Sequence, residues 1–223
     1  MPSSTVPMMF DSADGDGIAR SRPVGGTSKR LIDIVLASIG IVMLLPLFSL
    51  CVLALLLTSR GPVLFRHRRV GFQGRHFDCL KFRTMAQDAS ELSEYSDGDP
   101  RQPKQCAETL RYAPRVTPFG AVLRKTSLDE LPQLFNVLRG DMSIVGPRSL
   151  TDEELEQYGL RISAYLACKP GITGLWQISG RSKTTYRERV ILDYTYAKNW
   201  SLVMDAKTML LTLPVFLSSS DAY

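Results

Sequence analysis

The chain has few cysteines and histidines, and neither residue type forms a metal-binding or catalytic pattern. Its four cysteines are scattered without a CxxC pair, and one lies inside an apolar run, which argues against a zinc site and a disulfide framework. The two histidines, His67 and His76, have no cysteine or carboxylate at the spacing of metal ligands. We therefore expect a reducing, cytoplasmic setting and chemistry that does not depend on histidine.

Nucleotide-binding signatures and internal repeats are also absent. Without a GxxxxGK[ST] loop or a GxGxxG fingerprint, the sequence argues against a nucleotide triphosphatase and a dinucleotide enzyme. It also lacks a helix-turn-helix pattern and the interleaved aromatics of single-strand binders, so we expect no nucleic acid partner. The formal net charge of +5 still suits anionic partners. A phospholipid surface and phosphorylated small molecules remain as candidates.

The chain contains one long apolar run. Residues 31–58 hold a single charged residue, Asp33, as is typical of a membrane segment. Pro46 lies in the middle and removes a backbone donor, so each half is too short to span the bilayer. Basic residues flank both ends of the run, and the positive-inside rule therefore favours a re-entrant hairpin with both flanks on the cytoplasmic face. A kinked helix that crosses the membrane is the alternative. Asp33 follows Arg30 by three residues, which predicts an ion pair between them.

We divide the chain into a disordered tail over residues 1–28, a re-entrant membrane helix over 29–58 and a cytoplasmic catalytic domain over 59–223. The predicted fold is α+β and mostly helical. In the catalytic domain, two short strands joined by a glycine-containing turn precede a helix and a buried strand. The last apolar segment, with Pro214 inside it, predicts an interfacial amphipathic helix, and a core-packing helix is the alternative. Three glycines predict a close backbone approach to a ligand: Gly171, Gly174 and Gly180.

Asp129 and Glu130 are the strongest candidates for chemistry. Ser127 followed by Glu130 matches a capping box, which predicts a helix over 127–138 and favours a purely structural role. Pro132 weighs against this interpretation, because proline is accepted only in the first turn of a helix. The helix then starts later, or its first turn is distorted. In either case we expect the positive end of the helix to keep Asp129 ionised as an anionic nucleophile.

Five segments together carry a family resemblance. In chain order they are KRLIDIVLASIGIVMLLPLFSL, LKFRTM, RVTPFGAVLRKTSLDELPQLFNVLRGDMSIVGPR, KPGITGLWQISGR and LDYTYAKNWSLVMD. Through them the chain resembles the monotopic phosphoglycosyl transferases, the bacterial sugar transferase family, over residues 24–223. Within this family the segments PVGGTSKR, SLDELPQLFN and GLWQISGR are most similar to the galactose-1-phosphate transferases that begin exopolysaccharide synthesis.

The resemblance implies a reaction and its partners. UDP-galactose and undecaprenyl phosphate would give undecaprenyl-diphosphate-galactose and UMP, with Mg²⁺ as cofactor, at the cytoplasmic face of the bacterial inner membrane. Glucose, N-acetylglucosamine or a deoxyamino sugar are the alternative sugars. A membrane-anchored anion-binding protein without catalysis is the alternative from another class. The large interfacial surface also makes a homodimer a possible assembly.

The resemblance assigns roles to individual residues. Asp129 matches the nucleophile that forms a covalent phosphosugar intermediate, Glu130 matches its helper, and both are candidate Mg²⁺ ligands. Arg30 matches a residue associated with the lipid phosphate. The candidates for binding the substrate phosphates are Lys81, Arg124, Arg148, Arg181 and Gln177. Two residues depart from the family pattern: Ser149 replaces the usual proline after GPR, and Leu45 replaces the polar residue that often precedes the membrane proline.

Overall fold

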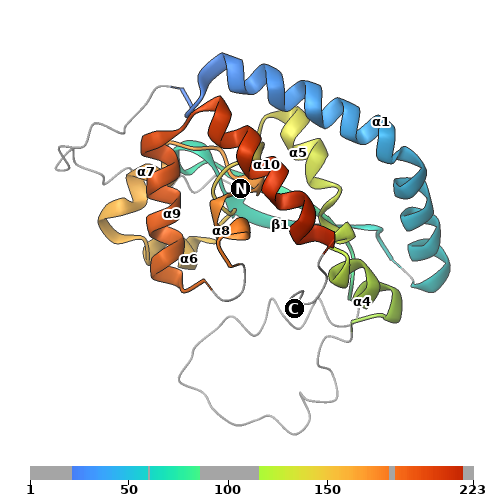
Figure 1. The fold of residues 1–223 in the computed structure, drawn as a ribbon. Coiled ribbons are helices and arrows are strands. Elements are labelled where there is room, and N and C mark those ends of the chain that lie inside the picture. Colours follow the sequence, from blue (N-terminus) through green and yellow to red (C-terminus); the bar gives the residue numbers. More distant parts are fainter. Residues whose placement is uncertain (1–21, 60, 86–115, 181–183, 218–223) are drawn as a thin grey trace, which may run out of the picture.

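The computed structural model describes residues 22–59, 61–85, 116–180 and 184–217 (Figure 1). In these ranges helices outweigh strands, which confirms the prediction of a mostly helical α+β chain. Most of the expected tail and residues 86–115 lie outside the described residues. The helices and strands are α1 (Gly26–Thr58), β1 (Leu64–Val70), β2 (His76–Phe82), α4 (Pro118–Lys125), α5 (Gln133–Arg139), β3 (Ser143–Val145), α6 (Asp152–Glu156), α7 (Ile162–Leu166), β4 (Gly171–Thr173), α8 (Leu175–Ile178), α9 (Tyr186–Asn199) and α10 (Leu202–Leu217), with short 3₁₀ turns η1 (Phe72–Gly74), η4 (Leu128–Glu130) and η5 (Gly159–Arg161).

Helix α1 begins at Gly26, earlier than the expected start at residue 29. The chain enters it through Gly25, whose φ of 87° is a left-handed conformation that glycine adopts without strain. Val24 is 4% exposed, and its N–H donates to the Ala167 carbonyl at 3.0 Å. Residues 24–28, which we placed in the tail, are therefore part of the fold.

Helix α1 is one helix that contains Pro46, without a break into two arms. In Figure 1 it runs across the top of the molecule and then turns down one side. Two features favour this bend. The Pro46 nitrogen cannot donate to the preceding turn, and the Ser49 hydroxyl donates to the Leu45 carbonyl at 3.0 Å. Re-entry into the membrane remains a prediction.

Much of α1 exposes apolar side chains and buries polar ones. Lys29, Asp33 and Ala37 recur at every fourth residue and are all buried. Apolar side chains that are at least half exposed include Leu31, Val35, Ile39, Val42, Met43, Leu45, Leu50, Leu53, Leu56 and Leu57. Among the described residues, α1 is the helix long and apolar enough to cross a membrane, and 17% of its most apolar stretch is buried. A helix this exposed is unlike the core helix of a soluble protein.

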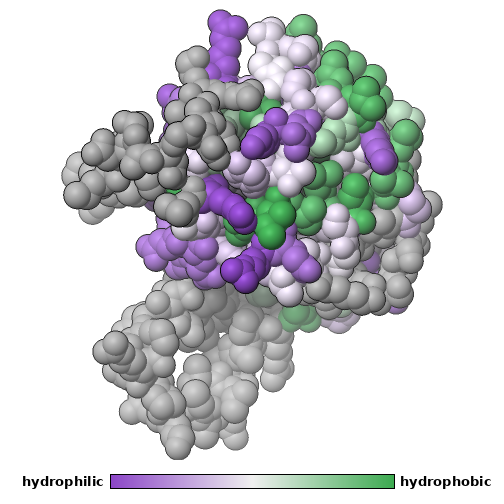
Figure 2. Space-filling model, turned by 60° about the vertical axis from the view of Figure 1, so that its left-hand side comes forward, coloured by the Kyte–Doolittle hydropathy of each residue, from purple (hydrophilic) through white to green (hydrophobic). Residues whose placement is uncertain are grey.

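Helix α10 has the same inverted distribution of side chains. Asp205, Thr208 and Thr212 are buried, whereas the exposed apolar residues of this helix are Leu202, Val203, Leu210 and Leu211. On the face drawn in Figure 2, hydrophobic residues gather on one side and hydrophilic residues on the other. An exposed apolar face on α10 is what the predicted interfacial helix requires.

The two predicted strands β1 and β2 form an antiparallel hairpin in which Phe65 pairs with Lys81 and His67 with Cys79. The turn between them passes through Gln73 and Gly74 at positive φ. Because side chains alternate along a strand, Lys81, Cys79 and their partners lie on one face of this hairpin. Val70, at the end of β1, bridges to Leu150 and so connects the hairpin to the segment that follows β3.

Strands β3 and β4 run parallel, and three glycines allow their ends to approach closely. A Cβ atom on Gly171 would lie 2.1 Å from the Gly146 nitrogen, and one on Gly174 would lie 2.1 Å from the Gly146 oxygen. A Cβ on Gly146 would lie 2.4 Å from the Lys169 oxygen. The expected approach of Gly171 and Gly174 to a ligand is therefore wrong, because their close neighbour is the protein's own backbone.

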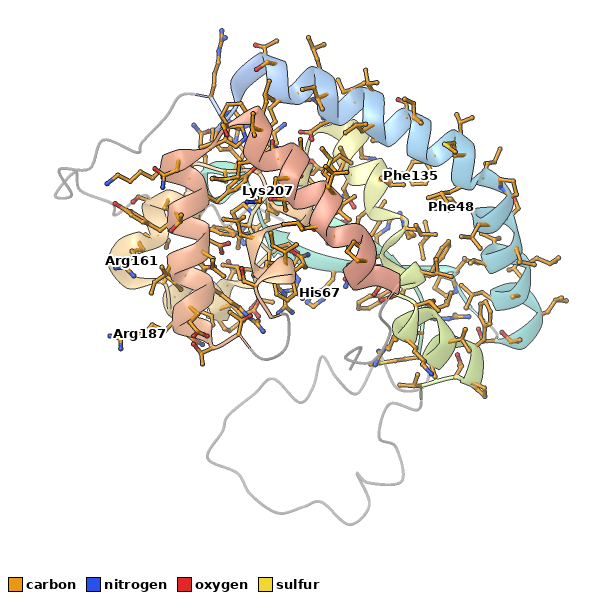
Figure 3. All side chains as sticks on the ribbon, in the orientation of Figure 1. Phe48, His67, Phe135, Arg161, Arg187 and Lys207 are labelled. Carbon is orange, nitrogen blue, oxygen red and sulfur yellow. The ribbon has the colours of Figure 1, made fainter. Side chains whose placement is uncertain are left out.

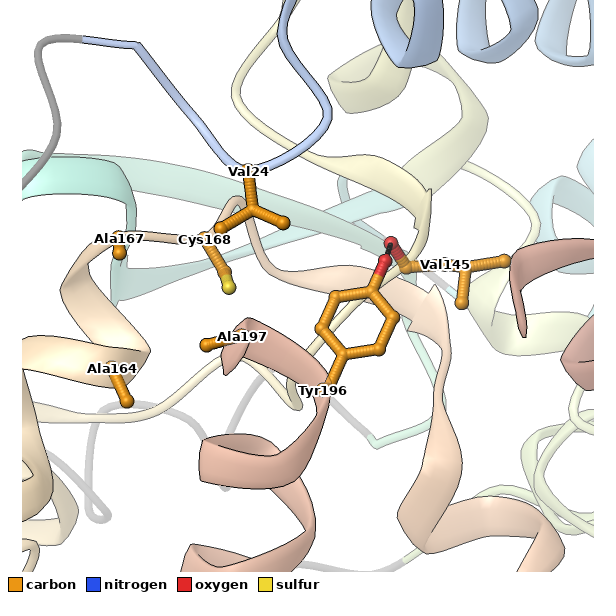
Figure 4. Packing of buried hydrophobic residues seen from close by; sticks show 7 residues of the cluster. All are labelled: Val24, Val145, Ala164, Ala167, Cys168, Tyr196 and Ala197. Atoms are coloured by element: carbon orange, nitrogen blue, oxygen red, sulfur yellow. Dashed lines mark hydrogen bonds between the residues drawn. The ribbon is translucent and has the colours of Figure 1, made fainter. Parts of the chain in front are cut away.

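The beginning of α1 is attached to the core by buried charges. Lys29 Nζ donates to Asp205 Oδ2 at 2.6 Å, and both side chains are less than 10% exposed. The other Asp205 oxygen accepts from Tyr196 OH at 2.8 Å. Tyr196 lies in an apolar cluster with Val145 (Figure 4), and its hydroxyl oxygen also lies 3.0 Å from the Val145 carbonyl oxygen. One network of polar contacts thus joins α1, α9, α10 and β3.

Asp33 and Arg30 do not form the predicted ion pair. Asp33 Oδ1 accepts from Ser143 Oγ and from the Ile144 N–H, both at 2.9 Å. The carboxylate therefore fastens α1 to β3. Farther along α1, Phe48 packs edge-on against Phe135 of α5 with ring centres 5.8 Å apart (Figure 3). Both halves of α1 thus pack against the body of the protein.

Candidate functional site

Asp129 and Glu130 lie in η4, the 3₁₀ turn between α4 and α5. The predicted capping box at Ser127 is wrong: Ser127 has a left-handed φ of 54° and its side chain caps nothing. Because Pro132 cannot continue a helix that started at Ser127, α5 starts at Gln133. Positive φ in a residue other than glycine is uncommon and costs energy. The carboxylate pair therefore lies in a constrained turn instead of the regular first turn of a helix.

Glu130 forms an ion pair across the site in place of a helix cap. Lys81 Nζ, from β2, donates to Glu130 Oε1 at 2.7 Å, and the two side chains are 29% and 34% exposed. Burial acts to lower the pKa of Lys81, but the Glu130 charge and hydrogen bond, with a contribution from Asp129, raise it overall. Lys81 thus stays positively charged between the two carboxylates.

Asp129 has no ion-pair partner within 4 Å among the described residues. Burial, followed by the neighbouring Glu130 charge, raises the pKa of its carboxyl to about 6, although Lys81 and Arg124 act in the opposite direction. We expected a helix N-terminus to hold this pKa low, but η4 is a single short turn. At pH 7 the group is still mostly ionised, and it is less stabilised by its surroundings than an ordinary aspartate. Such a carboxylate is suited to act as a nucleophile.

Arg124 lies at the same site. Its Nε donates to Thr84 Oγ1 at 2.8 Å, which holds the side chain between the end of β2 and α4. Its charge contributes to the lowering effect on the Asp129 pKa. Lys81 and Arg124 are therefore the two predicted phosphate-binding residues that the structure brings to the carboxylate pair.

Arg148 lies in the segment after β3, which the bridge between Val70 and Leu150 connects to the β1–β2 hairpin. Its neighbour Ser149 hydrogen-bonds the Cys79 thiol, whose pKa is raised by burial and also responds to the charges of Lys81 and Glu130. Cys79 therefore lies between the carboxylate site and the segment that carries Arg148. The Arg148 guanidinium carbon lies 5.5 Å from the centre of the Trp176 ring. The Ser149 backbone carbonyl accepts from Arg69 at 3.4 Å, a contact that does not depend on the side chain at this position.

The other predicted site residues lie elsewhere or are not described. Gln177 Nε2 donates to the Ile172 carbonyl at 3.0 Å, and Arg181 lies outside the described residues. Arg30 lies at the far end of α5, where its guanidinium donates to the carbonyls of Val137 and Leu138. The Val137 carbonyl also accepts from the Gly140 N–H at 3.0 Å, and a cation at a helix C-terminus is favourable. Arg30 is therefore separated from the carboxylate pair by the length of α5.

Sequence reasoning assigned no role to Asp205 or Arg189 and no protein partner to Lys29, and the structure places all three in notable contacts. Asp205 is a charge within a largely apolar segment, whereas Lys29 directly precedes one, and a charge in such a segment usually has a partner. That signal could have identified the buried pair. Arg189 gives no comparable signal, because its contact with Trp176 at 5.1 Å depends on how α8 meets α9.

Comparisons with known proteins agree with the resemblance in the sequence. A family model described as bacterial sugar transferase matches residues 24–219. The exopolysaccharide production protein ExoY of Rhizobium meliloti (strain 1021) is 44% identical over 205 residues, which cover 91% of this chain and 91% of the relative. The undecaprenyl-phosphate galactose phosphotransferase of Salmonella typhimurium is 48% identical over 166 residues, 73% of this chain and 35% of the relative. The UDP-glucose:undecaprenyl-phosphate glucose-1-phosphate transferase of Caulobacter vibrioides is 40% identical over 205 residues, 87% of this chain and 72% of the relative. The chain therefore belongs to the bacterial sugar transferase family.

Proposed function

We propose that this protein transfers galactose-1-phosphate from UDP-galactose to undecaprenyl phosphate, as the first membrane step of exopolysaccharide synthesis. The proposal rests above all on the Asp129 carboxylate, which is mostly ionised at neutral pH, has no ion-pair partner in the described chain and lies beside Lys81 and Arg124. The names of relatives that act on galactose and undecaprenyl phosphate support the choice of substrates.

The proposed chemistry proceeds in two balanced steps. A carboxylate oxygen of Asp129 attacks the β-phosphorus of UDP-galactose, and the bond from that phosphorus to the bridging oxygen breaks, which releases UMP. A phosphate oxygen of undecaprenyl phosphate then attacks the same phosphorus, and the bond to Asp129 breaks. The carboxylate is regenerated, and the product is undecaprenyl-diphosphate-galactose. A carboxylate nucleophile divides a difficult transfer into two easier ones.

The cations around Asp129 would stabilise the charge on the phosphoryl group. In phosphoryl transfer, catalysis consists largely of positioning and electrostatic stabilisation. Lys81 and Arg124 surround the carboxylate, and we propose that Arg148, Gln177 and Arg181 bind the remaining substrate phosphates. Arg30 is our candidate for the lipid phosphate. Its position at the far end of α5 implies that it would guide the lipid headgroup at a distance from the reacting atoms.

Asp129 and Glu130 also fit a magnesium ion. Mg²⁺ prefers oxygen ligands and binds through one or two carboxylates together with substrate phosphates and water. Asp129 and Glu130 are adjacent carboxylates, and the repulsion that raises the Asp129 pKa would be relieved by a cation between them. When bound, Mg²⁺ would neutralise charge on the phosphoryl oxygens. Glu130 would then divide its charge between the metal and Lys81.

We further propose that α1 is re-entrant and that residues 59–223 lie on the cytoplasmic face. The bend at Pro46 and the basic residues on both flanks support this topology. Single cysteines at Ser28 and Thr58, in a cysteine-free background, would be probed in intact cells with a membrane-impermeant thiol reagent. Both sites should be protected until the membrane is permeabilised. Labelling of one site alone in intact cells would establish a spanning helix.

The decisive experiment incubates the purified protein with Mg²⁺, undecaprenyl phosphate and a panel of UDP-sugars, and measures UMP release. We expect the highest rate with UDP-galactose. UDP-glucose is the principal competitor, because relatives with names specifying glucose match this chain at 40% identity. UDP-N-acetylglucosamine and a UDP-deoxyamino sugar complete the panel. No release with any sugar would leave the non-catalytic anion-binding protein as the interpretation. Size measurement on the same sample tests the predicted homodimer.

A further inference from the structure

Two arginines are held around the ring of Trp176. The guanidinium carbons of Arg148 and Arg189 lie 5.5 Å and 5.1 Å from the centre of the Trp176 ring. Both contacts have the geometry of cation–π interactions. In the part of the chain that the structure describes, neither arginine has a carboxylate within 4 Å. Two positive charges are thus concentrated near one aromatic ring.

Buried polar atoms without partners belong to α8, to α9 and to the residue just before the N-cap of α9. Within the described ranges, the indole Nε1 of Trp176, Nε of Arg189, Oγ1 of Thr184 and Oε1 of Gln177 form no hydrogen bond. Thr184 is 8% exposed, and it immediately precedes the capped start of α9. Buried polar groups are nearly always hydrogen-bonded, so several unpaired atoms between α8 and α9 indicate a place for a polar ligand. Three of these groups can donate a hydrogen bond, as an anion requires.

We propose that Arg148 and Arg189 form a phosphate-binding pair for a substrate, with Thr184 and Trp176 as additional donors. The proposal rests on the proposed function and extends it to Arg189, Trp176 and Thr184. Guanidinium groups are well suited to phosphate because they offer several N–H donors in a plane. The Trp176 ring keeps both guanidinium groups in place. Unlike a carboxylate, the ring does not neutralise their charge. The phosphate belongs either to the nucleotide or to the lipid.

The competing explanation is structural. The charge of Arg189 lowers the pKa of Asp193, although burial raises it overall to about 7. Arg189 could therefore serve to stabilise Asp193 within α9. A structural role predicts that loss of Arg189 lowers thermal stability and leaves substrate affinity unchanged. A phosphate-binding role predicts a loss of affinity that lysine restores only in part, because lysine keeps the positive charge but lacks the planar set of N–H donors.

The test uses the full-length protein and the variants Arg189→Gln, Arg189→Lys and Arg187→Gln. Arg187 is the matched control, because it is exposed on the same helix and lies at the outer side of α9 in Figure 3. UMP affinity is measured by calorimetry, and KM and kcat are measured for UDP-galactose and undecaprenyl phosphate. We expect Arg189→Gln to weaken UMP binding or raise the KM for undecaprenyl phosphate about tenfold or more, because hydrogen bonds to charged groups are stronger than those between neutral groups. Arg187→Gln should have little effect, and kcat should change less than KM.

The two measurements identify the source of the phosphate. Weaker UMP binding assigns the pair to the nucleotide, and a raised KM for undecaprenyl phosphate alone assigns it to the lipid. Equal UMP affinity and equal KM values in wild type and Arg189→Gln would overturn the proposal, whatever happens to the melting temperature. UMP binding needs no turnover. If the protein binds UMP through Arg189 but transfers no sugar, the proposed function is refuted and the phosphate-binding pair still stands.

Discussion

Two lysine–carboxylate pairs of nearly equal length lie in different parts of the molecule. The pair of Lys29 and Asp205, at 2.6 Å, is buried and joins α1 to α10. The pair of Lys81 and Glu130, at 2.7 Å, is about one-third exposed and joins β2 to η4. The distances therefore do not reveal which pair stabilises the fold and which belongs to a site.

The surroundings of the two pairs distinguish them. Asp205 also accepts from Tyr196 and from Trp200 Nε1, so both of its oxygens are occupied by donors. Glu130 instead adjoins a second carboxylate, Asp129, which has a raised pKa. A buried charge with all its partners contributes to structure. An excess carboxylate beside the pair indicates chemistry, because the protein holds it in a less favourable environment than water would provide.

The largest expected effect is at Asp129. Asp129→Asn should reduce UMP release by about 10⁴-fold or more, because a nucleophile cannot be replaced by its neighbours. Its melting temperature should not fall, since the substitution removes the repulsion with Glu130. The matched control, Asp78→Asn, changes an exposed aspartate of β2 and should retain activity. An active Asp129→Asn enzyme would rule out the covalent intermediate, as would failure to trap a phosphosugar on Asp129 in the wild type.

The second effect concerns the buried pair. Asp205→Asn should destabilise the fold by about 3–5 kcal/mol, because it leaves the Lys29 charge buried without a counter-charge. Denaturant unfolding in detergent measures this loss. The double variant Lys29→Met with Asp205→Leu should recover part of the stability, since it removes both charges. If Asp205→Asn were as stable as wild type, the buried pair would contribute nothing to the stability of the fold.

The third effect is at the exposed pair and should separate activity from stability. Lys81→Met should lower the rate of UMP release about 10²-fold, as loss of one charge-stabilising donor does in other enzymes. The free energy of unfolding should change by less than about 1 kcal/mol, because exposed ion pairs contribute little. Lys81→Arg serves as the charge-preserving control. If Lys81→Met unfolded as readily as Asp205→Asn, the distinction between the two pairs would fail.

The smallest effect is on pH dependence. Tyr158 OH donates to buried Asp193, whose pKa is raised to about 7, mainly by burial. The folded state thus binds this proton more tightly than the unfolded chain, where the pKa is about 4. The free energy of unfolding should therefore fall as the pH rises from about 4 to about 7. Asp193→Asn keeps an acceptor for Tyr158 and has no proton to lose. Its melting temperature should decline less than that of wild type between pH 5 and pH 8, and parallel curves would contradict this assignment.

Much of the local structure could be predicted from the sequence. The β1–β2 hairpin follows from two β-rich runs around a glycine turn, and Gly140 ends α5 at a φ of 97° as a helix-ending glycine does. Thr151 and Glu154 form a capping box at α6, and their spacing in the sequence is that of this motif. These features depend on residues close in sequence, and local patterns are most informative there.

The errors arose where distant segments meet. The Ser127 motif matches a capping box in sequence, but Lys81, 49 residues away, takes the Glu130 side chain. Likewise, Arg30 donates to the carbonyls at the end of α5 and does not pair with Asp33, its predicted partner. The environment that raises the Asp129 pKa is also built from separate elements. Sequence patterns identify such residues as candidates, whereas their partners depend on the fold.

The close approach of two chain segments at Gly146, Gly171 and Gly174 affects how a mutational scan of this protein should be interpreted. Any side chain at these positions meets backbone at little more than 2 Å, so nearly every substitution should abolish function. A scan scored on polysaccharide production alone would therefore mark all three as active-site residues. If protein abundance is measured as well, these glycine variants should yield little folded protein. Asp129 variants should accumulate normally. Intolerance to substitution at these glycines reports the space between two chain segments, not contact with a sugar nucleotide.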